Sequence, residues 1–243
     1  MFLKPKLWEI PTPSEAVLNG LSAKTAELTA RLRQIGQSHQ AARFASSLAV
    51  EDMVITDIIA KNHFNIQVFT LDTGLLHKET LALLAELEQY YPQLKIEKLT
   101  PHFEDTRQFV AEHGARAYYE SVPLRRQCCF IRKIEPLNRA LAGADAWLSG
   151  QRREQSATRT ELPFAERDQT RNMDKYNPIF DWSEQEVWAY ILSHRVPYNR
   201  LYHQGFPSIG CDPCTRPVKE GEDIRAGRWW WENKDSKECG LHK

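Results

Sequence analysis

Short strand-like segments alternate with amphipathic helical segments along residues 42–113, and this alternation limits the fold more than any other feature of the sequence. We expect strands at 42–47, 66–71 and 94–99, separated by helices at 51–61, 78–90 and 103–113. A helix of this length between two strands returns the chain so that the second strand runs parallel to the first. The sequence therefore predicts an α/β fold with a doubly wound, mainly parallel sheet.

The regions on either side of this alternation have their own patterns. Residues 1–40 carry a weak helical pattern and are predicted to form a helical lead-in. Further along we expect a helix at 125–141 that Pro136 kinks or interrupts, a strand at 146–149 and a helix at 183–194. Residues 205–243 are rich in Gly, Pro and charge. We predict one α/β domain over 1–215 and a mobile, loop-rich tail over 216–243.

The charge balance narrows the class of partners. The 243 residues include 32 Lys and Arg against 32 Asp and Glu, so the formal net charge is zero. A protein that holds nucleic acid through bulk electrostatics needs a basic face, and this balance argues against one. No apolar run approaches the ~20 residues that span a bilayer, and residues 1–13 lack the order of a secretion signal. We expect a soluble, cytoplasmic protein without membrane or nucleic-acid partners.

Four of the five cysteines form two close pairs in the sequence, Cys128–Cys129 and Cys211–Cys214. In a reducing compartment such pairs are typical of metal ligands or redox groups. Adjacent side chains on a helix diverge by about 100°, which suits several irons better than one tetrahedral ion. Four thiolates then favour a 4Fe–4S cluster. Zinc, and buried structural cysteines, stay open as alternatives.

The fifth cysteine, Cys239, lies close to the C-terminus, between Lys237 and His242. A thiol in a terminal segment can enter a site, react and leave again to meet a partner. A neighbouring cation favours the thiolate, which is the reactive form. Cys239 is therefore a candidate nucleophile, with an incidental exposed thiol as the alternative.

Candidate anion-binding groups follow the predicted strands, where ligands of doubly wound sheets bind. Arg152, Arg153 and Arg159 follow the strand at 146–149, and the segment 225–231 adds Arg225 and Arg228 before three tryptophans that we expect to pack the tail. Arginine forks suit phosphate and sulfate oxygens. The Ser46–Ser47 turn lies where nucleotide-binding proteins often carry a glycine-rich loop, yet it lacks glycine, so tight cradling of a polyphosphate is not expected.

Together these features resemble the assimilatory adenylyl-sulfate reductases, relatives of the phosphoadenylyl-sulfate reductases in the adenine-nucleotide α-hydrolase-like superfamily. The matching blocks follow one another in order between residues ~45 and 242 and include both cysteine pairs and the terminal Glu238-Cys239-Gly240-Leu241-His242. The other blocks are Leu71-Asp72-Thr73-Gly74 with His77, Gly150-Gln151-Arg152-Arg153, and Arg225-Ala226-Gly227-Arg228 with Trp229-Trp230-Trp231.

The resemblance implies a reaction and a set of roles. Cys239 would attack the sulfur of adenylyl sulfate and release AMP, and thioredoxin would reduce the resulting S-sulfocysteine to free sulfite. Cys128, Cys129, Cys211 and Cys214 would hold a 4Fe–4S cluster, with Lys133 between cluster and substrate. Ser46, Leu71, Thr73, Gly74 and Gly150 would bind the nucleotide, and Arg159, Arg225 and Arg228 the phosphosulfate. The family also suggests a homo-oligomer.

Three rival readings remain at this point. The 3′-phosphorylated nucleotide could be the substrate, alone or beside adenylyl sulfate, although cluster cysteines go with adenylyl sulfate in the family. An ATP pyrophosphatase-type tRNA thiolase would share the fold, but it needs an S-G-G-x-D-S loop and a basic face that this chain lacks. A zinc-stabilised binding module would leave Cys239 without a role.

Overall fold

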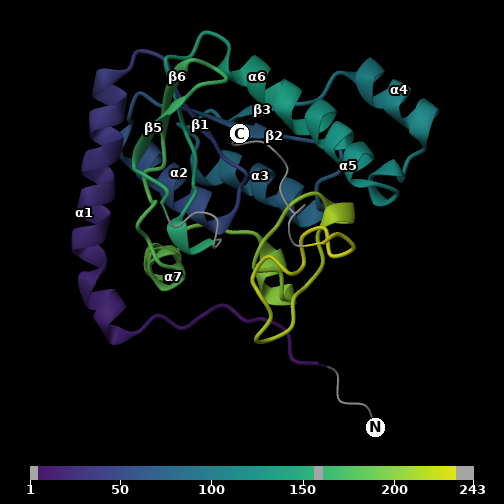
Figure 1. The fold of residues 1–243 in the computed structure, drawn as a ribbon. Helices are drawn as coiled ribbons and strands as arrows, with labels where there is room; N and C mark the ends of the chain where they lie inside the picture. The colour runs from purple at the N-terminus through teal and green to yellow at the C-terminus, as the bar shows by residue number, and fades with distance from the viewer. Residues whose placement is uncertain (1–4, 156–160, 234–243) are drawn as a thin grey trace.

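A computed structural model describes residues 5–155 and 161–233 of the chain (Figure 1). In this part the strands form a six-stranded sheet of order β3-β2-β1-β4-β6-β5. All neighbours pair in parallel except β5 and β6, which form an antiparallel edge. The strands are β1 Ala42–Ala45, β2 Gln67–Leu71, β3 Glu97–Leu99, β4 Ala146–Leu148, β5 Ala165–Asp168 and β6 Met173–Tyr176. The predicted mainly parallel α/β fold is confirmed.

The helices lie within a few residues of their predicted positions. Side-chain caps explain three of the starts. Ser14 and Ser121 accept hydrogen bonds from the Val17 and Leu124 amides, and Ser183 forms a capping box with Glu186. The α-helices are α1 Glu15–Ser38, α2 Val50–Asn62, α3 Lys78–Tyr90, α4 Phe103–His113, α5 Val122–Cys129, α6 Glu135–Leu141 and α7 Glu184–His194. Short 3₁₀ turns are η1 Ala117–Tyr119, η3 Arg153–Gln155, η5 Arg200–Gln204 and η6 Asp212–Cys214.

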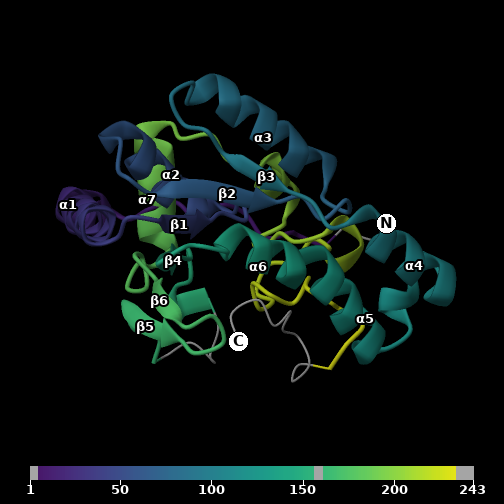
Figure 2. The same ribbon diagram turned by 90° about the horizontal axis from the view of Figure 1, so that it is seen from above.

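Two apolar cores lie on opposite faces of the sheet, because successive strand residues point to opposite sides. Val68 of β2 and Leu148 of β4 belong to the larger core, together with residues of α1, α2, α3 and α7. Their neighbours Phe69 and Trp147 belong to the second core, with residues of α6. Figure 2 shows the resulting layers, with α3 and α6 on opposite sides of the sheet. Both faces are covered, as a parallel sheet requires.

Two local features differ from the sequence-based expectation. The hairpin β5–β6 was not predicted, because its strands are short and rich in charged residues. The helix expected at 125–141 consists of α5, a π-helical segment η2 (Phe130–Ile134) and α6. Pro136 lies in the first turn of α6, where its missing amide hydrogen matters least, and the helix widens in the preceding turn. The interruption therefore lies before the proline.

The region after Pro197 folds back onto the rest of the molecule through backbone contacts. An isolated bridge joins Leu76 to Cys211, and another joins Thr215 to Arg228. The Trp8 amide donates to the Val218 carbonyl at 2.9 Å. These contacts attach the described part of the predicted tail, residues 216–233, to the rest of the molecule. No helix among the described residues is long and apolar enough to cross a membrane.

Candidate active site at the carboxyl ends of the strands

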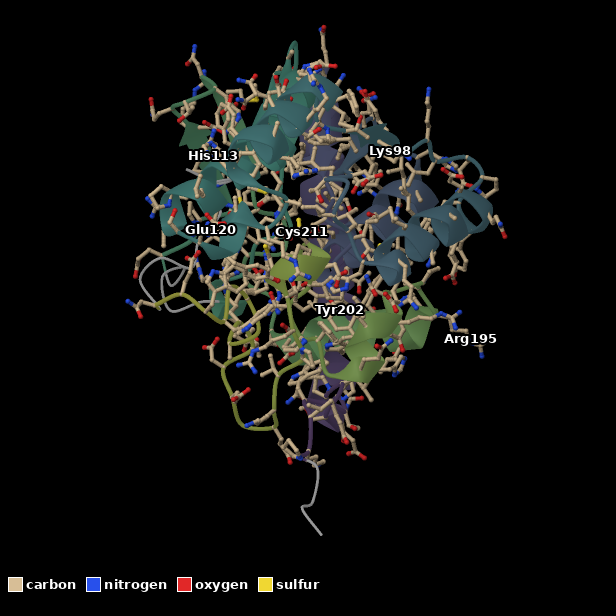
Figure 3. The ribbon with its side chains drawn as sticks, turned by 90° about the vertical axis from the view of Figure 1, so that its right-hand side faces the viewer. Lys98, His113, Glu120, Arg195, Tyr202 and Cys211 are labelled. Atoms are coloured by element: carbon tan, nitrogen blue, oxygen red, sulfur yellow. The ribbon has the colours of Figure 1, made fainter. Side chains whose placement is uncertain are left out.

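A cavity of about 240 Å³ opens where β1, β2 and β4 end, and it is closed on the other side by residues 207–211 and 224–229. This edge is where a doubly wound sheet binds its ligands. Most of the predicted site residues in the described part of the chain line this cavity. They are Ser46, Leu71, Thr73, Lys133, Gly150, Cys211, Arg225 and Arg228. Figure 3 shows Cys211 near the centre of one face, above Tyr202, which also lines the cavity.

Three further predicted site residues do not line the cavity in the described part of the chain: Gly74 lies beside it, and Arg159 and Cys239 are not among the described residues. Gly74 is in the turn after β2, next to the lining residue Thr73, and has a φ of 70° that favours glycine. Its amide donates to Asp72 Oδ1 at 3.0 Å. Arg159 and Cys239 fall outside the described residues, so their roles stay predictions.

A buried carboxylate organises the turn after β1 that lacks glycine. The amide and the hydroxyl of Ser47 each donate to Asp52 Oδ2 at 2.6 Å. The Gly150 amide also donates to this carboxylate, so Asp52 joins the loops after β1 and β4. Burial raises the pKa of Asp52 to about 7, against the hydrogen bonds from Ser47 that lower it. Sequence reasoning missed Asp52, because an acidic residue in the first turn of a helix is normally exposed to solvent and interacts with the helix dipole.

Two arginines after β4 have structural partners of their own. Arg152 is buried, and its Nη2 lies 2.9 Å from Glu51 Oε1 while its Nη1 donates to the Trp182 carbonyl at 3.1 Å. The Arg153 guanidinium stacks on Phe180 at 4.6 Å. Within the described residues, neither belongs to the cavity lining. These contacts give both arginines a structural role, and their role as anion-binding groups stays a prediction.

The cavity instead takes its positive charge from Lys133, Arg225 and Arg228. Arg228 is only 8% exposed; its guanidinium stacks on Trp229 at 4.7 Å, and Nη1 donates to Ser208 Oγ at 3.3 Å. Lys133 comes from the π-helical segment η2. Guanidinium and ammonium groups in a cavity with apolar walls attract an anionic ligand more strongly than in open water.

The two cysteine pairs lie beside this cationic end of the cavity. All four cysteines are buried. The Asp212 amide donates to the Leu75 carbonyl at 2.8 Å, and Thr73 Oγ1 lies 3.3 Å from Cys211 Sγ, so the C-x-x-C segment is fixed to the turn after β2. Leu75 packs against the apolar groups of both pairs. The fold thus brings 128–129 and 211–214 to one region.

The thiols are shielded from water. Burial raises the pKa of Cys128 to about 11, and the neighbouring Cys129 raises it further. Burial likewise raises the pKa of Cys214 to about 12, with Cys211 adding to the effect. Among the described residues, no three His, Cys, Asp or Glu side chains are grouped closely enough to hold a metal ion.

Two of the three consecutive tryptophans, Trp229 and Trp231, pack the tail as the sequence predicts, whereas Trp230 is exposed. Trp229 is 1% exposed and lies against Cys211 and Cys214. The Trp231 ring centroid is 4.5 Å from that of Tyr119, and Tyr119 donates to the Pro213 carbonyl at 2.6 Å. The described part of the tail is therefore attached to the same elements that carry the cysteines.

Comparison with known proteins adds independent observations. Residues 42–217 match the family described as Phosphoadenosine phosphosulfate reductase domain. A Neisseria meningitidis protein named Adenosine 5'-phosphosulfate reductase is 66% identical over 99% of this chain and 98% of its own length. A protein of the same name from Allochromatium vinosum is 51% identical over 96% of this chain and 90% of its own length.

Solved structures show the same fold. The phosphoadenylyl-sulfate reductase from Candida auris, solved as a phosphate complex, has a TM-score of 0.68 and 26% identity. The match covers 86% of this chain and 100% of that one. The FMN adenylyltransferase of Candida glabrata has a TM-score of 0.59 at 12% identity, covering 96% of this chain and 82% of that one, and is similar in fold alone.

Proposed function

The chain belongs to the family of the phosphoadenosine phosphosulfate reductase domain, and from that premise we propose that it reduces adenylyl sulfate to sulfite and AMP in sulfate assimilation. The observation that carries the proposal is the cavity in which strand-end residues meet three cations beside two cysteine pairs. Relatives at 51% and 66% identity bear the name of this activity. Thioredoxin is the proposed electron donor and the cytoplasm the proposed location.

The charges in the cavity support one orientation of the substrate. Two carboxylates lie at the start of α2: Asp52 accepts hydrogen bonds from Ser47 in the preceding turn, and Glu51 is paired with Arg152. An anion gains little there. We therefore propose that the phosphosulfate binds beside Lys133, Arg225 and Arg228, which provide positive charge, with Arg159 as a further contact. The adenosine then lies along Ser46, Leu71, Thr73 and Gly150, with Gly74 shaping the adjoining turn.

The proposed reaction begins at Cys239. Its thiolate attacks the sulfur of adenylyl sulfate, a sulfur–sulfur bond forms, and the bond from sulfur to the bridging oxygen breaks. AMP leaves with the electron pair of that bond, and the negative charge that grows on its phosphate is stabilised by Arg228 and Lys133. A thioredoxin thiolate then attacks Cys239 Sγ and releases sulfite. The second thioredoxin thiol resolves the mixed disulfide, which leaves oxidised thioredoxin and the free Cys239 thiolate.

The family resemblance implies a 4Fe–4S cluster. The described thiols are not grouped around a single metal-ion position, but a cluster that offers a separate iron to each thiolate does not need them to be, and the donor set fits such a cluster by its chemistry. Cys128, Cys129, Cys211 and Cys214 supply four buried thiols, the number that such a cluster takes. Bound there, the cluster would supply an anionic centre that tunes the electrostatics of the substrate site. Lys133, which lowers the pKa of both Cys128 and Cys214, would balance charge between these thiolates and the substrate.

The test is sulfite release from adenylyl sulfate and, in parallel, from its 3′-phosphorylated analogue, with thioredoxin as reductant. We expect a large preference for adenylyl sulfate. Activity with the 3′-phosphorylated nucleotide alone would keep the chemistry and overturn the substrate. No sulfite from either nucleotide, from protein with intact iron and sulfide, would refute the proposal and favour the thiolase class. Stoichiometric zinc without iron would favour a binding module.

A further inference from the structure

A buried ion pair connects the tail to the helix that carries the first cysteine pair. Arg125 of α5 and Glu232 meet through two hydrogen bonds, Nε to Oε1 at 2.7 Å and Nη2 to Oε2 at 2.9 Å. Their side chains are 0% and 3% exposed. The Glu232 amide also donates to the Trp229 carbonyl at 2.9 Å, so backbone and side chain are both held.

The surroundings of this pair fix its position from both sides. The Arg125 guanidinium lies 4.7 Å from the centroid of the Trp229 ring, as does that of the cavity residue Arg228. Arg125 also hydrogen-bonds the Cys129 thiol. Figure 1 shows the end of the described chain, in yellow, below α5. Glu232 is thus attached to a unit that contacts both the cysteine pair and the substrate cavity.

Stability alone is a weak reason for such a pair. Removing two charges from water costs several kcal/mol per ion, and well-packed apolar residues often replace a buried pair without loss. By contrast, a bidentate Arg–carboxylate pair specifies distance and orientation at once. The pair therefore serves best to set where this part of the chain lies.

We infer that Glu232 is a positioning residue that fixes, through Arg125, the point from which the segment bearing Cys239 extends. The inference rests on the proposed role of Cys239 as nucleophile. Cys239 lies only seven positions after Glu232 in the sequence, so the thiol stays within about 25 Å of the anchor. The effective concentration of a tethered group falls as its tether lengthens. Release of the anchor lengthens the tether and lowers the local concentration of the thiolate at the substrate.

The experiment measures the first half-reaction alone. Enzyme is mixed with adenylyl sulfate without reductant, and the rate of S-sulfonation of Cys239 is followed by quenching and mass spectrometry. Glu232→Gln keeps the shape but removes the charge. A second variant, Arg125→Met with Glu232→Leu, removes both charges and leaves no buried ion unpaired. The matched control is Glu220→Gln, whose carboxylate is 61% exposed and pairs with Lys6.

We expect both anchor variants to slow S-sulfonation by at least about fivefold, while affinity for AMP and the content of bound iron and sulfide stay at wild-type values. The control should react like wild type. Wild-type rates in both anchor variants would overturn the inference, as would a loss of AMP affinity that accounts for the whole rate change. Sulfite release by Cys239→Ser would instead overturn the proposed function, so the two failures are distinguishable.

Discussion

At the residue scale, the contacts of each cavity side chain indicate its role. Arg228 is held by Trp229 and Ser208, so its guanidinium is already oriented before an anion arrives. A pre-oriented guanidinium loses less freedom on binding, and its charge-assisted hydrogen bonds contribute about 1.5–3 kcal/mol.

Arg228→Ala should therefore lower kcat/KM for adenylyl sulfate by about tenfold to a hundredfold. The visible spectrum of the protein should stay unchanged, because Arg228 is not a ligand of the proposed cluster. Arg216→Ala, at an exposed position nearby, is the control and should behave like wild type. Equal kinetics for the two variants would contradict the assignment of Arg228 to the anion site.

Asp52 gives the stability a pH dependence whose sign follows from its burial. Its pKa is about 7 in the folded protein, above the ~3.9 of an unfolded aspartate. Between these values the folded state holds a proton that the unfolded state has released. The contribution of Asp52 to the free energy of unfolding is therefore largest at low pH, falls as pH rises from about 4 to about 7, and is constant above.

Asp52→Asn removes this titration. Relative to the variant, the wild type should lose a few kcal/mol of unfolding free energy between about pH 5 and about pH 8, measured by urea denaturation. Parallel pH curves for the two proteins would show that Asp52 does not titrate in this range.

At the scale of elements, the alternation of strands and helices determined the layers and the edge where ligands bind. The predicted strands that become β1, β2 and β4 end at the cavity, so Ser46, Thr73 and Gly150 could be found from the sequence. The hairpin β5–β6 could not, because its charged residues hide an edge strand. The Arg152–Glu51 pair was missed for another reason: it joins residues 101 positions apart, and local patterns carry no sign of that contact.

The junction of β4 with α2 leaves no space at Gly150. A Cβ added there would lie 2.0 Å from Asp52 Oδ1. Gly150→Ala should lower the free energy of unfolding by about 1–3 kcal/mol and weaken AMP binding, because the Asp52 contacts to Ser47 must shift.

Gly20→Ala in α1 is the matched control, since nothing lies within 4 Å of the added Cβ. It should stabilise the protein by about 1 kcal/mol through helix propensity. Denaturant titrations of both variants compare the two effects. A Gly150→Ala protein as stable as wild type would show that the two loops are not joined as described.

The C-x-x-C segment is fixed to the turn after β2 by the Asp212–Leu75 hydrogen bond and by Thr73. Cys211→Ser removes one of the four proposed cluster thiolates without changing these backbone contacts. We expect loss of most bound iron, of the visible absorption and of activity, measured on anaerobically purified protein. Full iron and sulfide content in this variant would mean that the proposed ligand set is wrong.

At the scale of the molecule, the sheet, the cysteine pairs and the tail enclose one cavity from different sides. The sheet supplies the nucleotide end, η2 and the segment 225–229 supply the cations, and the tail is fixed at Glu232 before the stretch that contains Cys239. The sequence motifs predicted most of these site elements one by one. The sheet, the cysteine pairs and the tail come together through long-range contacts such as Arg125–Glu232, which only the folded chain reveals.

The central claim is that Cys239 takes the sulfonate group from adenylyl sulfate. The most direct measurement is mass spectrometry of wild-type and Cys239→Ser protein after incubation with adenylyl sulfate and no reductant. The account predicts one added SO₃ group on the peptide containing Cys239 in wild type, released as sulfite by thioredoxin, and no adduct in the variant, which should still bind AMP. Sulfite production by Cys239→Ser at the wild-type rate would contradict the account.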